Sequence, residues 1–359
     1  MVLEEVSAIL GGPQGAGVET SIAILARALA RIGYGILANR EYYSNITGRH
    51  SYVHLQISST RLPRSLSYPV DLLAAMDAET VLTHFTDIAR GGVAIYDSSS
   101  LNKHLDEIPS IEEATRERVR KACMERGAEC SVEGVVKYLE REYGVKLVEV
   151  DFSKVLKGLA KTFKLDPRQL SRYASGVLVS SVAVVLDIHE DALSYALGAH
   201  FKGRESLIQQ NMHIYKLVSA ELSRFRGTLR LGKPSIGLDK VLLATGNDVV
   251  AMAKVVAGVR YQSYYPITPA ADESLLLERY SYVEYEEGSV GPLVVMQTED
   301  EIAAIASAIG ASLAGARSST STSGPGFDLM VEGLSFAGAN EVPVVITYYQ
   351  RGGPSTGQP

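Results

Sequence analysis

The chain has 359 residues, of which 46% are hydrophobic, and a formal net charge of −6 at pH 7. This length predicts two domains, each large enough to bury its own core. The mildly acidic charge, without a basic patch, argues against nucleic acid as a partner. The N-terminus lacks the positive region of a secretory signal, and the longest apolar run, residues 177–186, is too short to span a bilayer. This run is interpreted as a buried helix or strand, and a cytoplasmic protein without membrane contact is expected.

The cysteines and histidines do not indicate a metal site. Cys123 and Cys130 are seven residues apart in a polar segment, a spacing that matches neither a zinc site nor an iron–sulfur cluster. The seven histidines show no metal-ligand spacing either. The two cysteines are therefore predicted to be free thiols in a reducing compartment, and the chain is expected to bind no metal by itself.

The first part of the chain alternates between short apolar runs and amphipathic segments. An apolar run at residues 6–10 precedes a glycine-rich loop and then hydrophobic residues at helical spacing, namely Val18, Ile22, Leu25, Leu29 and Ile32. The alternation continues to residue 150, and the pattern turns wholly helical over residues 166–226. It predicts an α/β domain over residues 1–226, with a mostly parallel sheet covered by helices.

A second alternating region follows a short segment rich in glycine, proline and lysine. This segment, residues 227–239, is interpreted as the domain linker. Five strand-like runs then alternate with helical segments, at residues 241–244, 261–265, 293–296, 317–322 and 342–349. They predict a doubly wound α/β domain over residues 240–359, which ends without a helix after its last strand.

The glycine-rich loop at residues 11–17 contains Gly12, Gly15 and Gly17. A glycine-rich turn before a helix presents backbone N–H groups and the positive end of the helix dipole, which suit an anion. The order of the glycines does not match the dinucleotide fingerprint, and no P-loop lysine follows. Two interpretations stay open: a site for a phosphate or for coenzyme A, and a tight turn without a ligand.

Two loops of the second domain carry polar side chains after predicted strands. Thr268 lies between Pro266 and Pro269, which restrict the backbone and hold the hydroxyl where it would suit a small carboxylate or carbonyl. Arg351 follows the last strand, and a guanidinium there would pair with a substrate carboxylate. Each residue has a plain structural alternative, a cap of the next helix for Thr268 and an ordinary surface arginine for Arg351.

Three carboxylates precede a helical segment of small apolar residues. They are Glu299, Asp300 and Glu301, and the segment after them is apolar enough to be buried on nearly all sides. A carboxylate buried there needs a partner or a function, because burying an unpaired charge is costly. Helical periodicity does not show which of the three points inward.

Four motifs of the second domain, in this order, resemble the pyrimidine-binding domain of the α subunit of 2-oxoacid:ferredoxin oxidoreductases. They are ATGNDVVAMAKVVAGV, YYPITPAADES, QTEDEIAAIASAIGA and TSGPGFDLMVEGLSFAGANEVPVVITYYQRGGPSTG. The N-terminal part, with GGPQGAGV and the helical block, resembles the γ domain of the same family. Several archaeal members fuse γ ahead of α in this order.

The resemblance implies a reaction and a set of site residues. The reaction is the oxidative decarboxylation of a 2-oxo acid, such as pyruvate or 2-oxoglutarate, with coenzyme A to acyl-CoA, CO₂ and reduced ferredoxin. Glu301 would be the catalytic glutamate that hydrogen-bonds N1′ of thiamine diphosphate. Thr268 and Arg351 would bind the substrate, and the cofactor pocket would be lined by Ser323, Gly324, Pro325 and Gly326.

Two departures from the family pattern imply a partner. The Gly-Asp-Gly motif that holds the diphosphate and Mg²⁺ is missing, and so are the iron–sulfur cysteines. In the resembling complexes both belong to a β subunit, so we expect activity only in a heterodimer whose β subunit holds the diphosphate, Mg²⁺ and a 4Fe–4S cluster. Family α subunits continue beyond the Arg351 loop, so a chain truncated within the pyrimidine-binding domain is expected.

Two other functions stay open at this point. One is a different thiamine enzyme, such as an acetolactate-synthase-like lyase, which needs no iron–sulfur electron acceptor. The other is a non-catalytic assembly subunit whose glycine loop binds a nucleotide or coenzyme A.

Overall fold

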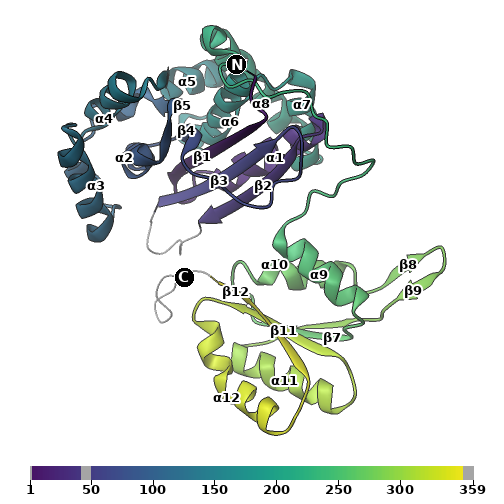
Figure 1. Cartoon of the computed structure of the whole chain (residues 1–359). Coiled ribbons are helices and arrows are strands. Elements are labelled where there is room, and N and C mark those ends of the chain that lie inside the picture. The colour runs from purple at the N-terminus through teal and green to yellow at the C-terminus, as the bar shows by residue number, and fades with distance from the viewer. Residues whose placement is uncertain (1, 42–49, 351–359) are drawn as a thin grey trace. The chain divides into compact units, whose positions relative to one another are not determined.

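The computed structural model describes residues 2–41 and 50–350. The chain divides into two compact units, Met1–Lys240 and Val241–Pro359. Both units have helices packed on a β-sheet, so the α/β prediction is confirmed (Figure 1).

The first unit is built on a six-stranded sheet with the order β2-β3-β1-β4-β5-β6. From β1 through β4 and β5 to β6 the pairing is parallel, whereas β3 runs antiparallel to both β1 and β2. The sheet is therefore mostly parallel, as predicted, with an antiparallel edge. Its strands are β1 (Glu5–Pro13), β2 (Gly35–Glu41), β3 (His50–Ser58), β4 (Val70–Ala75), β5 (Ile88–Asp97) and β6 (Lys146–Val150).

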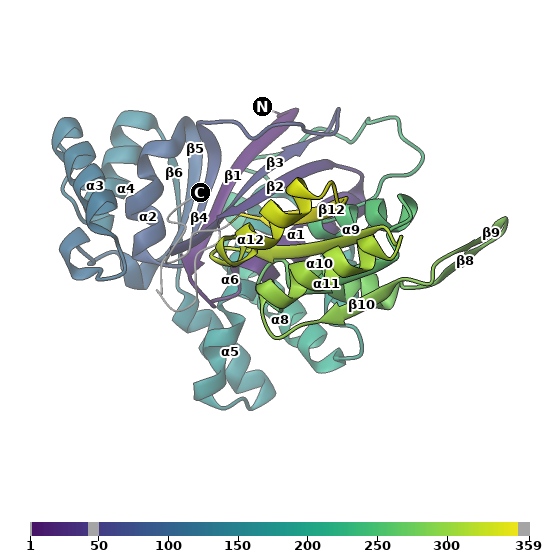
Figure 2. The same ribbon diagram turned by 90° about the horizontal axis from the view of Figure 1, so that it is seen from below.

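Helices cover both faces of this sheet. Successive residues of β1 point to opposite faces: Val6, Ala8 and Leu10 pack with α1, α6 and α8, while Ile9 packs with α2, α3 and α4. Figure 2 shows α2, α3 and α4 grouped beside β5 and β6. The α-helices and the π-helix η4 are α1 (Val18–Ile32), α2 (Ala78–His84), α3 (Glu113–Arg126), α4 (Val132–Tyr138), η4 (Leu139–Tyr143), α5 (Phe152–Phe163), α6 (Ala174–Leu186), α7 (Glu190–His200) and α8 (Glu205–Glu221). Short 3-10 turns are η1 (Phe85–Asp87), η2 (Ser98–Ser100), η3 (Leu105–Glu107), η5 (Pro167–Tyr173) and η6 (Ser223–Phe225).

The most apolar helix of the first unit lies in its core. Among the described residues, Pro167–Leu186 is the one segment long and apolar enough to cross a membrane. Of the apolar 18-residue stretch within it, 72% is buried inside the protein. Its α6 portion contributes buried residues from Val177 to Leu186 to the main core cluster. The prediction that residues 177–186 form a buried element is confirmed, and the burial explains the apolar composition.

The segment expected to be the linker is anchored at its start. The N–H groups of Gly227 and Leu229 donate to the carbonyls of Val184 and Val185, at 3.0 and 3.1 Å. Leu229 itself is buried in the core of the first unit. Residues 227–231 therefore pack on this unit, because their leucines need burial.

The second unit has a four-stranded, wholly parallel sheet with the order β10-β7-β11-β12. Helices α9 and α10 cover one face and α11 and α12 the other, which is the doubly wound arrangement (Figure 1). The elements are α9 (Gly246–Val256), β7 (Tyr261–Tyr264), α10 (Ala271–Arg279), β8 (Val283–Tyr285), β9 (Gly288–Val290), β10 (Val294–Gln297), α11 (Glu301–Leu313), β11 (Ser318–Ser323), α12 (Gly326–Ala339) and β12 (Val344–Tyr349).

One predicted strand of the second unit is wrong. Residues 241–244 form no strand, and Val241, Leu242 and Leu243 are exposed. They lead directly to the capping box in which the Thr245 hydroxyl accepts from the Asp248 N–H group and starts α9. An apolar run becomes a strand only when a neighbouring strand supplies hydrogen bonds, and the local sequence does not show whether one will. The sequence analysis also did not predict the small β8–β9 hairpin.

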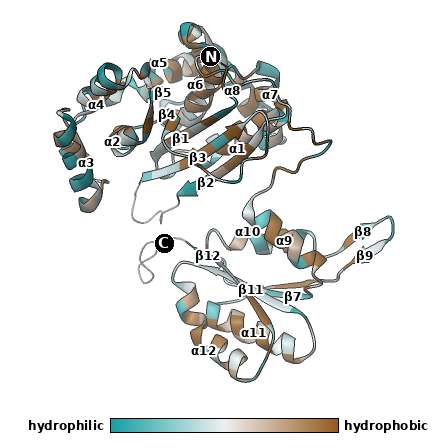
Figure 3. Ribbon diagram, in the orientation of Figure 1, coloured by the Kyte–Doolittle hydropathy of each residue, from teal (hydrophilic) through white to brown (hydrophobic). Residues whose placement is uncertain are grey.

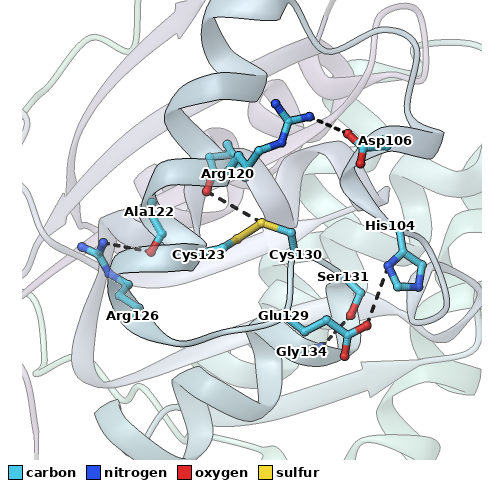
Figure 4. The surroundings of a disulfide bond; sticks show 11 residues. His104, Asp106, Arg120, Ala122, Cys123, Arg126, Glu129, Cys130, Ser131 and Gly134 are labelled. Atoms are coloured by element: carbon cyan, nitrogen blue, oxygen red, sulfur yellow. Dashed lines mark hydrogen bonds and ion pairs between the residues drawn. A yellow bond between two sulfur atoms is a disulfide. The ribbon is translucent and has the colours of Figure 1, made fainter.

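The prediction of two free thiols is also wrong, because Cys123 and Cys130 form a disulfide (Figure 4). Cys123 lies in the last turn of α3, and Gly127 ends this helix in the left-handed conformation, with a φ of 61°. The chain then reverses, so that the two Cα atoms lie 5.7 Å apart. The seven-residue spacing does not by itself reveal the reversal after Gly127 that brings the two cysteines together.

The disulfide anchors a helix that has little apolar packing of its own. Val119 and Cys123 are the buried residues of α3. Figure 3 shows α3 largely in the hydrophilic colour, in contrast to α11 and α12. The Arg116 guanidinium supplements the bond by donating to the carbonyls of Leu105 and Ile108, each at 2.8 Å. The disulfide therefore supplies part of the attachment to the core that buried apolar side chains would otherwise supply.

Reduction of the disulfide is expected to destabilise the first unit. Closing so short a loop lowers the entropy of the unfolded chain and is worth about 2 kcal/mol in the free energy of unfolding. Urea unfolding with and without dithiothreitol measures this loss. The variant Cys130→Ala should show a similar loss and no further response to the reductant. A wild-type transition that dithiothreitol leaves unchanged would contradict the bond.

Candidate functional site

Those predicted site residues of the second unit that the structure describes lie at one edge of its sheet. Because β10, β7, β11 and β12 all run parallel, their carboxyl ends share that edge. Thr268 lies in the loop after β7, Glu301 begins the helix after β10, and Ser323 ends β11. In open parallel sheets, ligands bind at the edge where the carboxyl ends of the strands lie. The described residues thus place three of the predicted positions on the edge where a ligand is expected.

The structure decides which of the three acidic residues before α11 points inward. Glu299 is exposed, and Asp300 is the N-cap residue, whose carboxylate accepts from the Ala303 N–H group at 2.7 Å. Glu301 is the first residue of α11, and only 4% of it is accessible. Glu301 is therefore the buried carboxylate at this edge of the sheet.

The Glu301 carboxylate is held between β11 and the start of α12. The Thr322 hydroxyl donates to Glu301 Oε1 at 3.3 Å. Among the described residues, this is the one hydrogen bond that the Glu301 carboxylate accepts. Gly326 lies so close that a Cβ added there would be 2.8 Å from Glu301 Cδ and would overlap Oε1. A carboxylate can accept several hydrogen bonds. One long bond leaves this buried group able to accept a stronger bond from a ligand.

The loop from Ser323 to Gly326 is shaped by its neighbours on the same edge. Ser323 and Gly324 are buried, and the Ser323 hydroxyl has no hydrogen-bond partner among the described residues. The Tyr348 hydroxyl of β12 donates to the Gly324 carbonyl at 2.8 Å, and Gly324 has a φ of 54°. Pro325 is the N-cap of α12, which begins at Gly326. The loop thus combines a buried hydroxyl with the N-terminus of a 14-residue helix.

Thr268 is exposed in the loop between β7 and α10. The Thr268–Pro269 peptide is cis, and the Asn247 side chain holds the loop by donating to the Pro269 carbonyl at 2.9 Å. The N-cap of α10 is Ala270, so Thr268 does not take that position. The other predicted substrate residue, Arg351, lies outside the described residues, two positions after the end of β12.

Sequence analysis missed a buried ion pair beside this edge. Lys254 of α9 is paired with Glu273 of α10, and their accessible fractions are 6% and 0%. Desolvation lowers the pKa of the Lys254 ammonium, and the Glu273 carboxylate opposes that shift. Glu273 lies in the first turn of α10, where a negative charge is favourable in any helix, so its position alone does not indicate a partner. Its partner lies on another helix, so the local pattern contained no signal for the pair.

The glycine-rich loop of the first unit is shorter than predicted. Strand β1 extends to Pro13, so Gly12 belongs to the strand, where an added Cβ would lie 2.9 Å from Met76. Gly17 is the left-handed N-cap of α1 and packs against Ser175. Gly15 has a φ of 86° and open space around it. Close packing therefore explains why Gly12 and Gly17 are glycines, and Gly15 is the one whose surroundings leave room for a ligand.

Family models match both units. Residues 7–220 match the pyruvate ferredoxin/flavodoxin oxidoreductase family, and residues 252–359 match the thiamine diphosphate-binding domain of pyruvate flavodoxin/ferredoxin oxidoreductase. The chain belongs to the pyruvate ferredoxin/flavodoxin oxidoreductase family. This membership confirms the resemblance inferred from the motifs. The two matched regions lie in the same chain, one in each unit.

Curated members of this oxidoreductase family match nearly the whole chain. The 2-oxoacid:ferredoxin oxidoreductase 1 subunit alpha of Aeropyrum pernix is 48% identical over 360 residues, which is 99% of this chain and 56% of the relative. The 2-oxoacid:ferredoxin oxidoreductase subunit alpha of Saccharolobus solfataricus is 40% identical, with the same two coverages of 99% and 56%. The chain thus spans about half the length of the curated relatives it matches.

A solved structure shows the same fold. The 2-oxoglutarate:ferredoxin oxidoreductase from Magnetococcus marinus, with 2-oxoglutarate, coenzyme A and succinyl-CoA bound, aligns with a TM-score of 0.69 at 26% identity. The alignment covers 99% of this chain and 54% of that one. Both units therefore follow the architecture of this oxidoreductase family.

The contact between Gly326 and Glu301 can be tested with a pair of glycine variants in α12. In Gly326→Ala the added methyl group overlaps the Glu301 carboxylate, so the free energy of unfolding should fall by about 2 kcal/mol. In Gly338→Ala the methyl group meets open space in the same helix, and a gain of up to about 1 kcal/mol is expected. Chemical denaturation measures both changes, and equal effects would show that Gly326 does not touch Glu301.

Proposed function

We propose that this chain acts in a 2-oxoacid:ferredoxin oxidoreductase, which converts a 2-oxo acid and coenzyme A into acyl-CoA and CO₂ while reducing ferredoxin. The family match and the relatives named as 2-oxoacid:ferredoxin oxidoreductase subunits support this proposal. The observation that carries it is the buried Glu301 carboxylate, with one long hydrogen bond, at the ligand-binding edge of a domain that matches a thiamine diphosphate-binding family.

The residues at this edge fit the aminopyrimidine end of thiamine diphosphate. The cofactor, when bound, supplies a nucleophilic carbon and accepts electrons during the decarboxylation of a 2-oxo acid. Glu301 would accept a hydrogen bond from the N1′–H group when the aminopyrimidine carries a proton on N1′, because the buried Glu301 carboxylate has spare acceptor capacity. Ser323, Gly324, Pro325 and Gly326 would line the cofactor, with the Ser323 hydroxyl available as a donor.

The substrate would be held by two side chains, those of Thr268 and Arg351. The exposed Thr268 hydroxyl, on a loop fixed by Asn247, would bind the 2-oxo acid by donating a hydrogen bond. The Arg351 guanidinium would pair with its carboxylate. The Magnetococcus marinus structure contains 2-oxoglutarate, and pyruvate is the other substrate we propose.

The rest of the active site is proposed to come from a β subunit. That partner would hold the diphosphate with Mg²⁺ and carry the 4Fe–4S cluster that passes electrons to ferredoxin. Relatives named as alpha subunits support a multi-subunit assembly. Among the described residues no group of three histidine, cysteine, aspartate or glutamate side chains is placed to hold a metal ion. A cytoplasmic location remains part of the proposal.

Glu301→Gln tests the catalytic role. The amide keeps the shape of the side chain but loses the charge that favours a protonated N1′, so kcat should fall about 10² to 10⁴-fold. The assay is reduction of ferredoxin or a dye by the complex with its β subunit, given coenzyme A and pyruvate or 2-oxoglutarate. Glu299→Gln, an exposed neighbour, should leave kcat unchanged.

Full activity in Glu301→Gln would overturn the site and favour a non-catalytic assembly subunit. Decarboxylation that proceeds without any electron acceptor would instead favour the acetolactate-synthase-like lyase.

The Gly12–Gly15–Gly17 loop is proposed to bind an anionic group of coenzyme A. The open space at Gly15 and the N-terminus of the 15-residue helix α1 support this.

Gly15→Asp should raise the KM for coenzyme A about tenfold through charge repulsion, an effect of the size of one charge-assisted contact. Gly15→Asn has nearly the same shape and also tolerates a positive φ, so it should change this KM much less. Equal effects of the two variants would contradict an anion at this loop.

A further inference from the structure

The last two residues of β12 tie this strand to both faces of the sheet. The Tyr349 hydroxyl donates to Glu273 Oε2 of α10 at 2.7 Å. The Tyr348 hydroxyl donates to the Gly324 carbonyl, which belongs to the loop before α12, at 2.8 Å. Successive side chains of a strand point to opposite faces, so one hydroxyl reaches helix α10 and the other reaches the loop before α12. The carboxyl end of β12 is thus fixed relative to two neighbouring segments of the same edge.

The Glu273 carboxylate is fully buried and uses both of its oxygens. Oε1 pairs with the Lys254 ammonium, and Oε2 accepts from Tyr349. The Lys254 ammonium also donates to Gln262 Oε1 of β7 at 3.1 Å. A buried charge that is paired and hydrogen-bonded on each side is costly to displace, so Glu273 has little freedom to move.

The same network continues into the centre of the sheet. Gln262 Nε2 donates to the hydroxyls of Ser274 in α10 and Ser321 in β11, each at 3.1 Å. The network therefore connects α9, β7, α10, β11 and β12. Burial and the adjacent Glu273 carboxylate raise the pKa of Tyr349, so its hydroxyl stays protonated and remains a donor throughout the physiological pH range.

This network reaches the two segments that carry the proposed substrate residues. Glu273 lies in the first turn of α10, five residues after Thr268, and Tyr349 lies two residues before Arg351. We propose that the Tyr349–Glu273 hydrogen bond is a positioning contact that holds the Thr268 loop in register with the strand end leading to Arg351. This inference rests on the proposed function of Thr268 and Arg351, and it assigns to Tyr349, Glu273 and Lys254 no contact with the substrate.

The polar composition of the network supports positioning over plain stability. Well-packed apolar side chains commonly stabilise a core as well as a buried ion pair does. Directed hydrogen bonds instead fix one arrangement of the groups they join. Here they join two loop-bearing elements, α10 and β12, which are not adjacent along the chain.

The variant Tyr349→Phe tests the inference, because it removes one hydroxyl and leaves the Lys254–Glu273 pair in place. Tyr264→Phe is the matched control: the Tyr264 hydroxyl donates to a carboxylate of the same helix, Glu278 Oε1, at 3.2 Å, but does not involve β12. Two measurements are made. Hydrogen exchange of the Ile267 and Ala271 amides reports on the Thr268 loop, and steady-state kinetics of the complex with the β subunit report on substrate binding.

In Tyr349→Phe the two loop amides should exchange about tenfold faster, and the KM for the 2-oxo acid should rise about tenfold, the size expected for one lost hydrogen bond to a charged group. The kcat and the KM for coenzyme A should stay unchanged. Tyr264→Phe should change neither exchange nor KM. A purely structural role of Tyr349 would lower stability without this selective effect on one KM.

The outcomes separate this inference from the proposed function. Unchanged exchange in Tyr349→Phe overturns the positioning contact, whatever the activity. Faster exchange with an unchanged KM in an active complex overturns its link to the substrate. If the wild-type complex turns over no 2-oxo acid, the proposed function fails, and the exchange result still decides whether Tyr349 holds the Thr268 loop.

Discussion

The second unit is organised by a central strand that is buried and made only of serine and threonine. Every residue of β11, from Ser318 to Ser323, is buried. The hydroxyls of Ser318, Thr320 and Ser323 have no hydrogen-bond partner among the described residues, whereas those of the other three residues bond to side chains inside the protein. On one face Ser319 and Ser321 bond to Gln262, and on the other Thr322 bonds to Glu301. The strand thereby draws polar side chains to both faces of the sheet. One set forms the buried network and the other forms the candidate site.

Glu273 and Glu301 lie in similar local settings but differ in their partners. Both are in the first turn of a helix that follows a parallel strand, and both are buried. Glu273 has a lysine and a tyrosine on its two oxygens, whereas Glu301 has one threonine among the described residues. A satisfied carboxylate holds structure in place, and an incompletely satisfied one can bind a ligand. This contrast distinguishes the structural glutamate from the proposed catalytic one.

Sequence patterns predicted those features that depend on neighbours along the chain. The periodicity of α1, the apolar runs of the parallel strands and the loop after β7 all follow from local spacing. The failures depended on partners that local periodicity does not identify. Residues 241–244 have no neighbouring strand to pair with. A chain reversal brings Cys130 to Cys123, and Lys254 forms its ion pair with Glu273 on another helix. The inward orientation of Glu301 also needed the fold, because Glu299 and Asp300 offer the same chemistry next to it.

The covalent anchor of α3 has a consequence for the surface of the first unit. A helix normally reserves one face for apolar residues, because burial is what attaches it to the core. With Cys123 bonded to Cys130, α3 needs few such residues, and most of EATRERVRKACMER is free to be charged. This helix can therefore change its pattern of charges through substitution while its place in the fold is kept by the sulfur–sulfur bond.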